Sequence, residues 1–443
     1  MLTEAPASTL VSPLAKPLRG DATVPGDKSI SHRAVLFSAM AQGTSHIAGI
    51  LDSADVRSSI AAVEKLGAQV DLSRQEDESL AGTITGWGKE GPRSGEVTID
   101  CGNSGTTARL LMGVLAPWDI DATITGDESL QKRPMRRITA PLMKMGVRFM
   151  PAGRETLPLT IHGTSQLRAI TYDAPMASAQ LKTAVLLAGV YAKGTTVLNE
   201  PSPSRNHTEL MLPEYGITTT VARGAASVTG PAVPQACSIQ VPGDPSSAAF
   251  LVCAAVLKRG STLKIHNVSL NTARAGFVRT LERMGVDTSM DYQGSAGKEP
   301  YGTIRVKYCD SLRGCEIPAE KIASLVDEVP VLALVAAHAH GITVFREVSE
   351  LRVKETDRLA AIVEGLEMVG VDAWIDGNDL YIEGQADFEI PDGVVFDSKN
   401  DHRLAMTWAL LGLTGNNPVH ITNFDSVKIS YPHFLRDIER LTQ

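Results

Sequence analysis

Residues 23–50 read TVPGDKSISHRAVLFSAMAQGTSHIAGI, which predicts a short strand, a polar turn, an apolar helix and, after a Gly-Thr break, a second strand. The pattern recurs about every 70 to 80 residues along the chain. Five further copies begin at TIDCGNSGTTARLLMGVLA (98–116), YDAPMASAQLKTAVLLAGVYAKGTTVLNE (172–200), VPGDPSSAAFLVCAAVLKRGSTLKIHNV (241–268), IPAEKIASLVDEVPVLALVAAHAHGITVFREV (317–348) and FDSKNDHRLAMTWALLGLTGNNPVHITNF (396–424). Because each helix is apolar almost all round, we expect it to be buried.

A second, amphipathic helix is predicted between these segments in four of the copies. The four stretches are VRSSIAAVEKLGAQV (56–70), RRITAPLMKMGVRF (136–149), GFVRTLERMGVDT (276–288) and DRLAAIVEGLEMVGVDA (357–373). Each contains a glycine where a left-handed helix cap is expected, namely Gly67, Gly146, Gly285 and Gly370. The repeating unit is therefore roughly βαβαββ.

Six such units in 443 residues exceed one hydrophobic core and indicate two lobes of three repeats each. The sixth copy ends before its last strands, and residues 8–24 offer a strand that completes it. We therefore expect a first lobe at 25–240 and a second lobe made of 1–24 plus 241–443. The chain would then cross between the lobes at a hinge near 21–26 and 240–243.

Composition excludes several classes of protein. Hydrophobic residues make up 43% and charged residues 21%, and no apolar stretch reaches the roughly 20 residues of a membrane span. The net charge of −8 disfavours nucleic acid and anionic membranes as partners. The N-terminus lacks the features of a secretory signal, so we expect a cytoplasmic protein. The five cysteines form no CxxC pair, which argues against zinc and disulfides and favours buried free thiols.

The starts of the apolar helices carry polar side chains in all six copies. A helix N-terminus presents free N–H groups and a partial positive charge, and so favours phosphate and carboxylate. Ordinary N-capping explains the Ser, Thr and Asp residues there equally well. Capping does not explain the cations in or beside these turns, which are Lys28, Arg33, Arg109, Lys132, Arg133, Arg205, Lys354, Arg358 and Arg403. Together they indicate a local site for more than one anionic group, gathered from both lobes.

Six segments give this pattern a specific resemblance. They are PGDKSISHR (25–33), GNSGTTAR (102–109), KRPM (132–135), ASAQ (177–180), RVKETDR (352–358) and NDHR (400–403). In this order they resemble the 3-phosphoshikimate 1-carboxyvinyltransferase family. The resemblance implies the α/β enolpyruvyl transferase fold, with two lobes of three βαβαββ repeats around buried helices, an inside-out α/β barrel. It also implies transfer of the enolpyruvyl group of phosphoenolpyruvate to the 5-hydroxyl of shikimate 3-phosphate, without metal or nucleotide cofactor. A monomer with these two small-molecule substrates is expected.

The resemblance assigns roles residue by residue. Ligands of shikimate 3-phosphate are expected at Lys28, Ser29, Arg33, Ser178, Gln180, Arg205, Asp327 and Lys354. Ligands of phosphoenolpyruvate are expected at Lys28, Gly105, Arg133, Gln180, Arg358 and Arg403. Addition across the double bond needs a base for the hydroxyl and an acid for the methylene carbon. Asp327 is the candidate base, and Glu355 or Lys28 the candidate acid.

Departures from the family pattern leave some points open. Ser178-Ala179-Gln180 resembles the second class of the family, which includes glyphosate-tolerant enzymes, whereas Gly105 is typical of sensitive ones. Lys428 is one residue out of register with a family lysine. The nearest alternative is the sister enzyme acting on UDP-N-acetylglucosamine, which usually carries a reactive cysteine that residues 127–135 lack. A non-catalytic anion-binding protein on the same scaffold is the other alternative.

Overall fold

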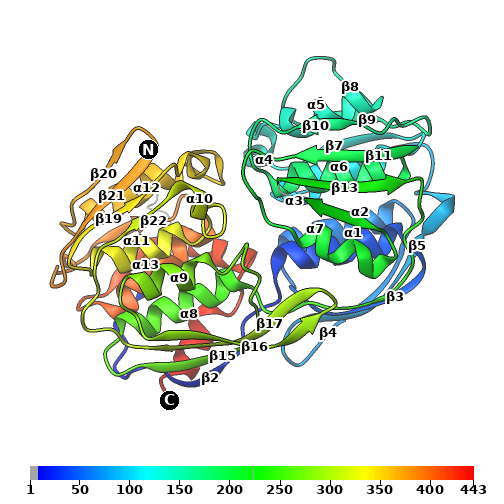
Figure 1. Ribbon diagram of the computed structural model, residues 1–443. Coiled ribbons are helices and arrows are strands. Elements are labelled where there is room, and N and C mark those ends of the chain that lie inside the picture. The colour runs from blue at the N-terminus through cyan, green and yellow to red at the C-terminus, as the bar shows by residue number, and fades with distance from the viewer. Residues whose placement is uncertain (1–7, 223) are drawn as a thin grey trace, which may run out of the picture. The chain divides into compact units, whose positions relative to one another are not determined.

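The computed structural model describes residues 8–222 and 224–443, and these separate into two compact units (Figure 1). Residues 1–7, part of the segment expected in the second lobe, lie outside the described residues. Unit 1 holds the described residues up to Pro25 together with Gly243–Gly294 and Pro300–Gln443. Unit 2 holds Gly26–Pro242 and the short segment Ser295–Glu299. Each unit has its own hydrophobic core.

Unit 2 contains three repeats of helices and strands. The first has α1 (Lys28–Met40), β3 (Gln42–Ile50), α2 (Ala54–Lys65), β4 (Gln69–Arg74) and β5 (Leu80–Trp87). The second has β6 (Glu96–Asp100), α3 (Gly105–Leu115), β7 (Asp121–Thr125), α4 (Glu128–Lys132), α5 (Arg136–Met145), β8 (Arg148–Met150) and β9 (Leu159–His162). The third has β10 (Thr171–Asp173), α6 (Ala179–Tyr191), β11 (Gly194–Asn199), α7 (His207–Met211), β12 (Thr219–Ala222), β13 (Ala225–Gly230) and β14 (Ser238–Gln240).

Unit 1 repeats the same plan. Its first two strands are β1 (Ser8–Val11) and β2 (Arg19–Ala22). The fourth repeat has α8 (Pro245–Leu257), β15 (Thr262–Ser269), α9 (Gly276–Arg283), β16 (Thr288–Ala296) and β17 (Glu299–Lys307). The fifth has β18 (Glu316–Ile317), α10 (Ala319–Ile322), α11 (Val329–Ala337), β19 (Gly341–Phe345), α12 (Arg358–Glu367), β20 (Ala373–Asp376) and β21 (Asp379–Gly384). The sixth has β22 (Val395–Asp397), α13 (His402–Thr414), β23 (Val419–Thr422) and α14 (Phe434–Arg440).

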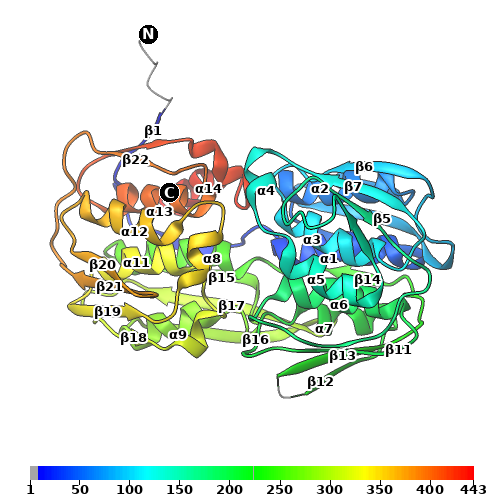
Figure 2. The same cartoon turned by 90° about the horizontal axis from the view of Figure 1, so that it is seen from above.

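The long helices of each unit are buried and the sheets flank them (Figures 1 and 2). In unit 2 these helices are α1, α3 and α6, and in unit 1 they are α8, α11 and α13. Such helices have no polar face to offer to water, so they must pack on one another and on the apolar side of the sheets. The expected α/β fold with buried helices is confirmed.

Four left-handed helix caps are confirmed as well. Gly67, Gly146, Gly285 and Gly370 all have positive φ, from 76° to 114°. Each ends an amphipathic helix that leads into a strand of its sheet, a geometry that glycine adopts without a Cβ penalty.

The sheets also show how the chain ends and crossings are used. β1 pairs antiparallel with β23, and Ser8 lies opposite Thr422, so the N-terminal segment completes the sixth repeat. β2 precedes α1 but joins β15 in a unit 1 sheet. Conversely, β14 precedes α8 but joins β3 in a unit 2 sheet. The strand that precedes the first long helix of one unit therefore belongs to a sheet of the other unit: β2 precedes α1 of unit 2 but lies in a unit 1 sheet, and β14 precedes α8 of unit 1 but lies in a unit 2 sheet.

Two further structural findings concern cysteines and hydropathy. All five cysteines are free, but only Cys101 and Cys253 are buried, and Cys237, Cys309 and Cys315 are half-buried, so the expectation of buried thiols was wrong for those three. Within residues 8–222 and 224–443, no helix combines the length and hydropathy that crossing a bilayer demands.

Candidate active site

Lys28 is the first residue of α1, at the positive end of that helix. The Asp27 carboxylate caps the helix by accepting the backbone N–H of Ile30 at 2.8 Å. The Lys28 ammonium lies 3.4 Å from the Asp55 carboxylate, which α2 supplies. Capping therefore leaves the lysine head group available for charge pairing, and Asp55 sets its direction.

A second cluster in unit 2 forms where α3 begins. Arg109 donates to the Gln180 side-chain oxygen at 2.8 Å, and the Gln180 amide donates to the Thr106 hydroxyl at 3.0 Å. A Cβ built on Gly105 would lie 2.9 Å from one Arg109 nitrogen and 3.4 Å from one Arg133 nitrogen. Two guanidinium groups thus face the bare backbone of Gly105, an arrangement that suits a small anion.

Arg133 follows α4, the short helix of the second repeat. Its guanidinium donates to the Asn103 side-chain oxygen at 2.7 Å and to the Ser129 hydroxyl at 3.4 Å. Neutral partners orient the group but leave its charge uncompensated by them. The neighbouring Lys132 is different, because its side chain is 73% exposed and pairs with Glu128 on the same helix. Lys132 is therefore a surface cation of α4.

Arg33 lies in the second turn of α1 and is 3% exposed. It donates to the backbone oxygen of Ser29 at 2.9 Å and to the hydroxyls of Thr183 and Thr208 at 2.7 and 2.9 Å. Burial lowers the pKa of this guanidinium to about 10, and nearby charges, including Arg205, contribute. Arg33 and Arg205 therefore act on the same region of unit 2.

Ser178 is placed as the N-cap of α6. Its hydroxyl accepts the backbone N–H of Leu181 at 3.3 Å. A hydroxyl in this position has its donor proton left for another acceptor. The capping interpretation is therefore correct for Ser178 and is compatible with binding an anion at the same oxygen.

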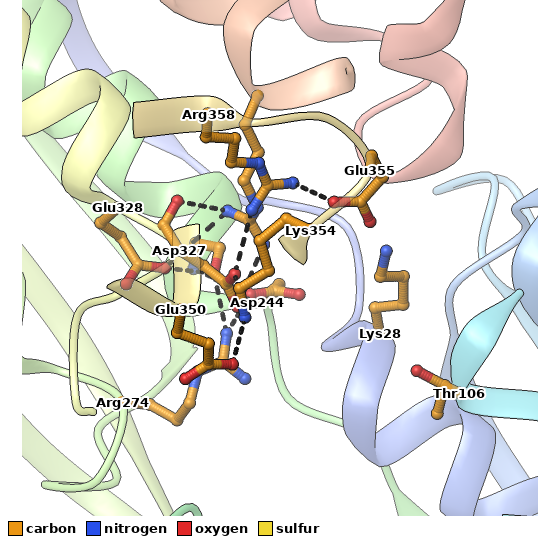
Figure 3. Close-up of polar contacts among 12 residues, drawn as sticks. Lys28, Thr106, Asp244, Arg274, Asp327, Glu328, Glu350, Lys354, Glu355 and Arg358 are labelled. Carbon is orange, nitrogen blue, oxygen red and sulfur yellow. Dashed lines mark hydrogen bonds and ion pairs between the residues drawn. The ribbon is translucent and has the colours of Figure 1, made fainter. Parts of the chain in front are cut away.

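The carboxylate of Asp327 in unit 1 faces three cations from different parts of that unit (Figure 3). Its oxygens lie 3.3 Å from Arg358, 3.8 Å from Lys354 and 3.8 Å from Arg403. Arg403 also donates to the Asp327 backbone oxygen at 3.2 Å. The starts of α11, α12 and α13, together with Lys354 in the segment before α12, thus place one acid among three positive charges.

Arg358 is held by carboxylates on every side. It is 1% exposed and donates to Asp401 at 2.7 and 3.3 Å and to Glu355 at 2.6 Å. Burial alone would lower the pKa of Arg358, but the charges of Asp401, Glu355 and Asp327 outweigh burial and raise it well above its usual value. The paired geometry from Asp401 is the strongest form of arginine recognition, so Asp401 fixes the guanidinium plane.

A buried polar chain supports the Asp327 region from behind. Ser246, in the first turn of α8, donates a short hydrogen bond to Glu328. Arg274 donates to Ser246 and to the Asp244 carboxylate, each at 2.9 Å. Figure 3 shows Arg274, Asp244 and Glu328 around Asp327. Buried charges need such partners, and here the partners tie the start of α8 to the start of α11.

Asp55 and Asp401 were not named individually from the sequence, and Arg109 was named among the cations but was assigned to neither substrate. Asp55 contacts Lys28, Arg109 contacts Gln180, and Asp401 contacts Arg358. Arg109 and Asp401 carry a signal, since GNSGTTAR ends in the first and NDHR contains the second. Asp55 lies in an ordinary helix start and carries none. No group of three or more His, Cys, Asp or Glu side chains suited to a metal ion is found in the part of the chain that the structure describes.

Comparison with known proteins identifies the family of the chain. The profile of the family described as EPSP synthase (3-phosphoshikimate 1-carboxyvinyltransferase) matches residues 14–438. A 3-phosphoshikimate 1-carboxyvinyltransferase of Coxiella burnetii (strain CbuK_Q154) is 42% identical over 418 residues, which are 94% of this chain and 93% of that protein. The solved EPSP synthase of Acinetobacter baumannii has a TM-score of 0.86 and 37% identity, covering 98% of both chains.

A more distant solved structure shares the fold alone. The enolpyruvyl transferase NikO of Streptomyces tendae has a TM-score of 0.78 at 18% identity and covers 99% of this chain and 98% of its own. The repeats, the clustered cations and full-length similarity to these proteins lead to one conclusion: the chain belongs to the EPSP synthase (3-phosphoshikimate 1-carboxyvinyltransferase) family of transferases.

Proposed function

We propose that the chain transfers the enolpyruvyl group of phosphoenolpyruvate to the 5-hydroxyl of shikimate 3-phosphate and releases phosphate, the shikimate-pathway reaction of its family. The observation that carries this proposal is the Asp327 carboxylate among Lys354, Arg358 and Arg403. The reaction needs a base beside groups that hold a substrate with two anionic ends. A protein that only bound anions would gain nothing from a carboxylate at that position.

Phosphoenolpyruvate is assigned to two groups of residues. In unit 2 the ligands are Lys28, Gly105, Arg133 and Gln180, and in unit 1 they are Arg358 and Arg403. Two carboxylate partners of Arg358 differ in burial: the Asp401 side chain is fully buried, whereas the Glu355 side chain is 23% exposed. An incoming phosphate or carboxylate displaces the more exposed partner at the lower cost. Binding therefore releases Glu355 from Arg358 and leaves Asp401 in place.

Shikimate 3-phosphate is assigned to Lys28, Ser29, Arg33, Ser178, Gln180, Arg205, Asp327 and Lys354. Its phosphate and carboxylate suit Arg33, Arg205 and the helix starts of unit 2. Its 5-hydroxyl suits Asp327, because an ionised carboxylate can accept the proton of a hydroxyl group.

The chemistry then proceeds in two steps. In the addition, Asp327 takes the proton of the 5-hydroxyl, and the hydroxyl oxygen bonds to the central carbon of phosphoenolpyruvate. An acid gives a proton to the methylene carbon at the same time. Glu355 and Lys28 are the two candidates for that acid. In the elimination, the methyl group loses a proton, the double bond reforms and phosphate departs, with acid and base roles reversed. Neither step changes an oxidation state overall.

Transfer to UDP-N-acetylglucosamine is the weaker candidate. The sister enzymes usually use a reactive cysteine in the second repeat, and Cys101 is the cysteine of this repeat here. Burial, with a smaller contribution from Asp100, raises the pKa of Cys101 to about 12. A thiol in that state is protonated at neutral pH and is a poor nucleophile.

Phosphate release from phosphoenolpyruvate tests the assignment. The purified chain is supplied with shikimate 3-phosphate, with UDP-N-acetylglucosamine, or with neither acceptor. We expect phosphate only with shikimate 3-phosphate. Release with the nucleotide sugar, or with neither acceptor, contradicts the proposal. We further propose a cytoplasmic monomer, which light scattering after gel filtration would check for the oligomeric state.

A further inference from the structure

The short helix α7 places three consecutive buried side chains against three parts of unit 2. His207 lies 3.2 Å from the Glu299 carboxylate, Thr208 contacts Arg33, and Glu209 lies 2.7 Å from the Lys182 ammonium. The exposed fractions of His207, Thr208 and Glu209 are 0%, 1% and 5%. None of the three residues belongs to the site assigned above, so their burial requires another explanation.

Thr208 fixes the direction of the Arg33 guanidinium. Its hydroxyl accepts the Arg33 Nε–H at 2.9 Å and lies 2.6 Å from the Thr183 hydroxyl. The Thr183 hydroxyl in turn accepts a second N–H of the Arg33 guanidinium. Thr183 belongs to α6 and Thr208 to α7, so the guanidinium is oriented by two helices. A shift of α7 would change the direction in which the remaining Arg33 N–H groups point.

Glu299 anchors α7 from the end of the β16–β17 hairpin. The two strands belong mainly to unit 1, but Ser295–Glu299 belongs to unit 2. Glu299 is 3% exposed, and a buried carboxylate is stable only with a partner such as His207. The hairpin end also fits closely, since a Cβ on Gly297 would lie 2.9 Å from the Glu214 carboxyl carbon, at a φ of +61°.

Electrostatics connect the same groups. Burial lowers the pKa of Arg33, whereas the carboxylates of Glu209, Asp27 and Glu299 act in the opposite direction. Glu299 is therefore close enough to stabilise the charged form of the arginine.

We propose that Thr208 and Glu299 are positioning residues for the acceptor substrate, with Glu299 fixing α7 through His207 and Thr208 fixing Arg33. The inference rests on the proposed function, in which Arg33 binds shikimate 3-phosphate. It predicts a defect specific to one substrate, since the contacts of His207, Thr208 and Glu209 described above reach Glu299, Arg33 and Lys182, none of which is assigned to phosphoenolpyruvate.

Steady-state kinetics and calorimetric binding of shikimate 3-phosphate test this on the intact enzyme. Thr208→Val removes the hydroxyl at nearly constant volume and should raise the KM and Kd for shikimate 3-phosphate about tenfold. The KM for phosphoenolpyruvate and kcat should change less than twofold. Thr208→Ser restores the hydroxyl and should recover the wild-type value. Glu299→Gln should raise the same KM roughly three- to tenfold.

The matched control is Asp291→Asn in the same hairpin. Asp291 pairs with Arg305 on the surface of the strands, and its loss should leave both KM values unchanged. In an Arg33→Ala background, Thr208→Val should add no further loss of affinity, because it acts through the missing arginine.

Three results overturn the inference: equal changes in both KM values, failure of Thr208→Ser to recover affinity, or additive losses in the double variant. If Glu299→Gln does not fold, the comparison of Thr208→Val with Thr208→Ser still tests the inference. If the wild-type chain does not bind shikimate 3-phosphate at all, the proposed function itself fails. If it binds and Arg33→Ala weakens binding while Thr208→Val does not, only the positioning role fails.

Discussion

As the proposed base, Asp327 must meet two demands that usually conflict, because a base must be reachable while its charge is balanced. Its side chain is 13% exposed and has Arg358, Lys354 and Arg403 as ionic neighbours. The Arg358 pair is shorter by 0.5 Å than the other two, and Arg358 is the most deeply buried cation. The three cations therefore restrict the orientation of a carboxylate that is still 13% exposed.

Asp327→Asn should lower kcat by about 10²- to 10⁴-fold, the contribution of a general base. Asparagine keeps the size and one acceptor oxygen, so both KM values should stay within a fewfold of wild type. Rapid-quench measurement of phosphate release checks this. The exposed pair of Asp425 with Lys428 supplies the control, since Asp425→Asn should be silent. Unchanged turnover in Asp327→Asn would refute the assigned base.

Asp401→Asn separates charge from helix capping. Asparagine caps helices about as well as aspartate, so α13 should persist. Arg358 would lose its fully buried carboxylate partner, and the KM for phosphoenolpyruvate should rise at least tenfold with little change for shikimate 3-phosphate. Circular dichroism checks the fold and steady-state kinetics check the substrate split. A rise in the KM for shikimate 3-phosphate alone would contradict this.

At the residue scale, the cations of the candidate site were easier to predict from the sequence than the carboxylates that pair with them. Lys354, Arg358 and Arg403 were recognisable because cations at helix starts need an explanation. Asp55 looked like an ordinary residue of a helix start, where aspartate is common, and Asp401 stood within the NDHR segment without a role of its own. Only the packing of α2 beside α1 and of α12 beside α13 shows that these carboxylates meet Lys28 and Arg358.

The helices follow from local rules in most of the chain. Positive φ at Gly146 lets α5 end and β8 begin within three residues, and the same device recurs at Gly67, Gly285 and Gly370. The third and sixth repeats gave no such signal. There α7 spans five residues and α14 seven, so too little sequence exists for a periodic pattern to be recognised.

Gly146→Ala should destabilise unit 2 by about 1 kcal/mol, because alanine at a φ of +114° is strained. Space is not the limit, since a Cβ there would lie 3.6 Å from the nearest atom, on Thr164. Gly146→Asn should cost less, because asparagine tolerates the left-handed conformation. Urea unfolding of both variants gives the comparison. Equal losses for the two substitutions would show that the backbone conformation is not the cause.

Taken as a whole, the molecule repeats one unit six times, and this was visible in the sequence because buried helices tolerate few polar residues. The sequence did not show that β2 joins a unit 1 sheet and β14 a unit 2 sheet where the chain passes between the units, because strands of four and three residues carry little pattern. Nor did any signal place Ser295–Glu299 in unit 2, because that depends on a tertiary contact between Glu299 and His207.

Removal of residues 1–11 should weaken unit 1 and spare unit 2. β1 covers the edge of β23, and Val11 is 3% exposed within the unit 1 core. Amide hydrogen exchange should therefore accelerate in β22 and β23 but not in β7 or β9. A chain beginning at Ser8 retains β1 and is the matched comparison. Uniform acceleration in both units would show that β1 supports more than its own sheet.

The pairing of β1 with β23 also sets an order of events on the ribosome. Thr422 is synthesised 414 residues after its partner Ser8. The nascent chain must therefore carry β1 unpaired while those residues are synthesised, whereas all residues of unit 2 are made before β23. A chain that ends before β23 would leave β1 and β22 without their partner strand. Such unpaired strand edges promote aggregation.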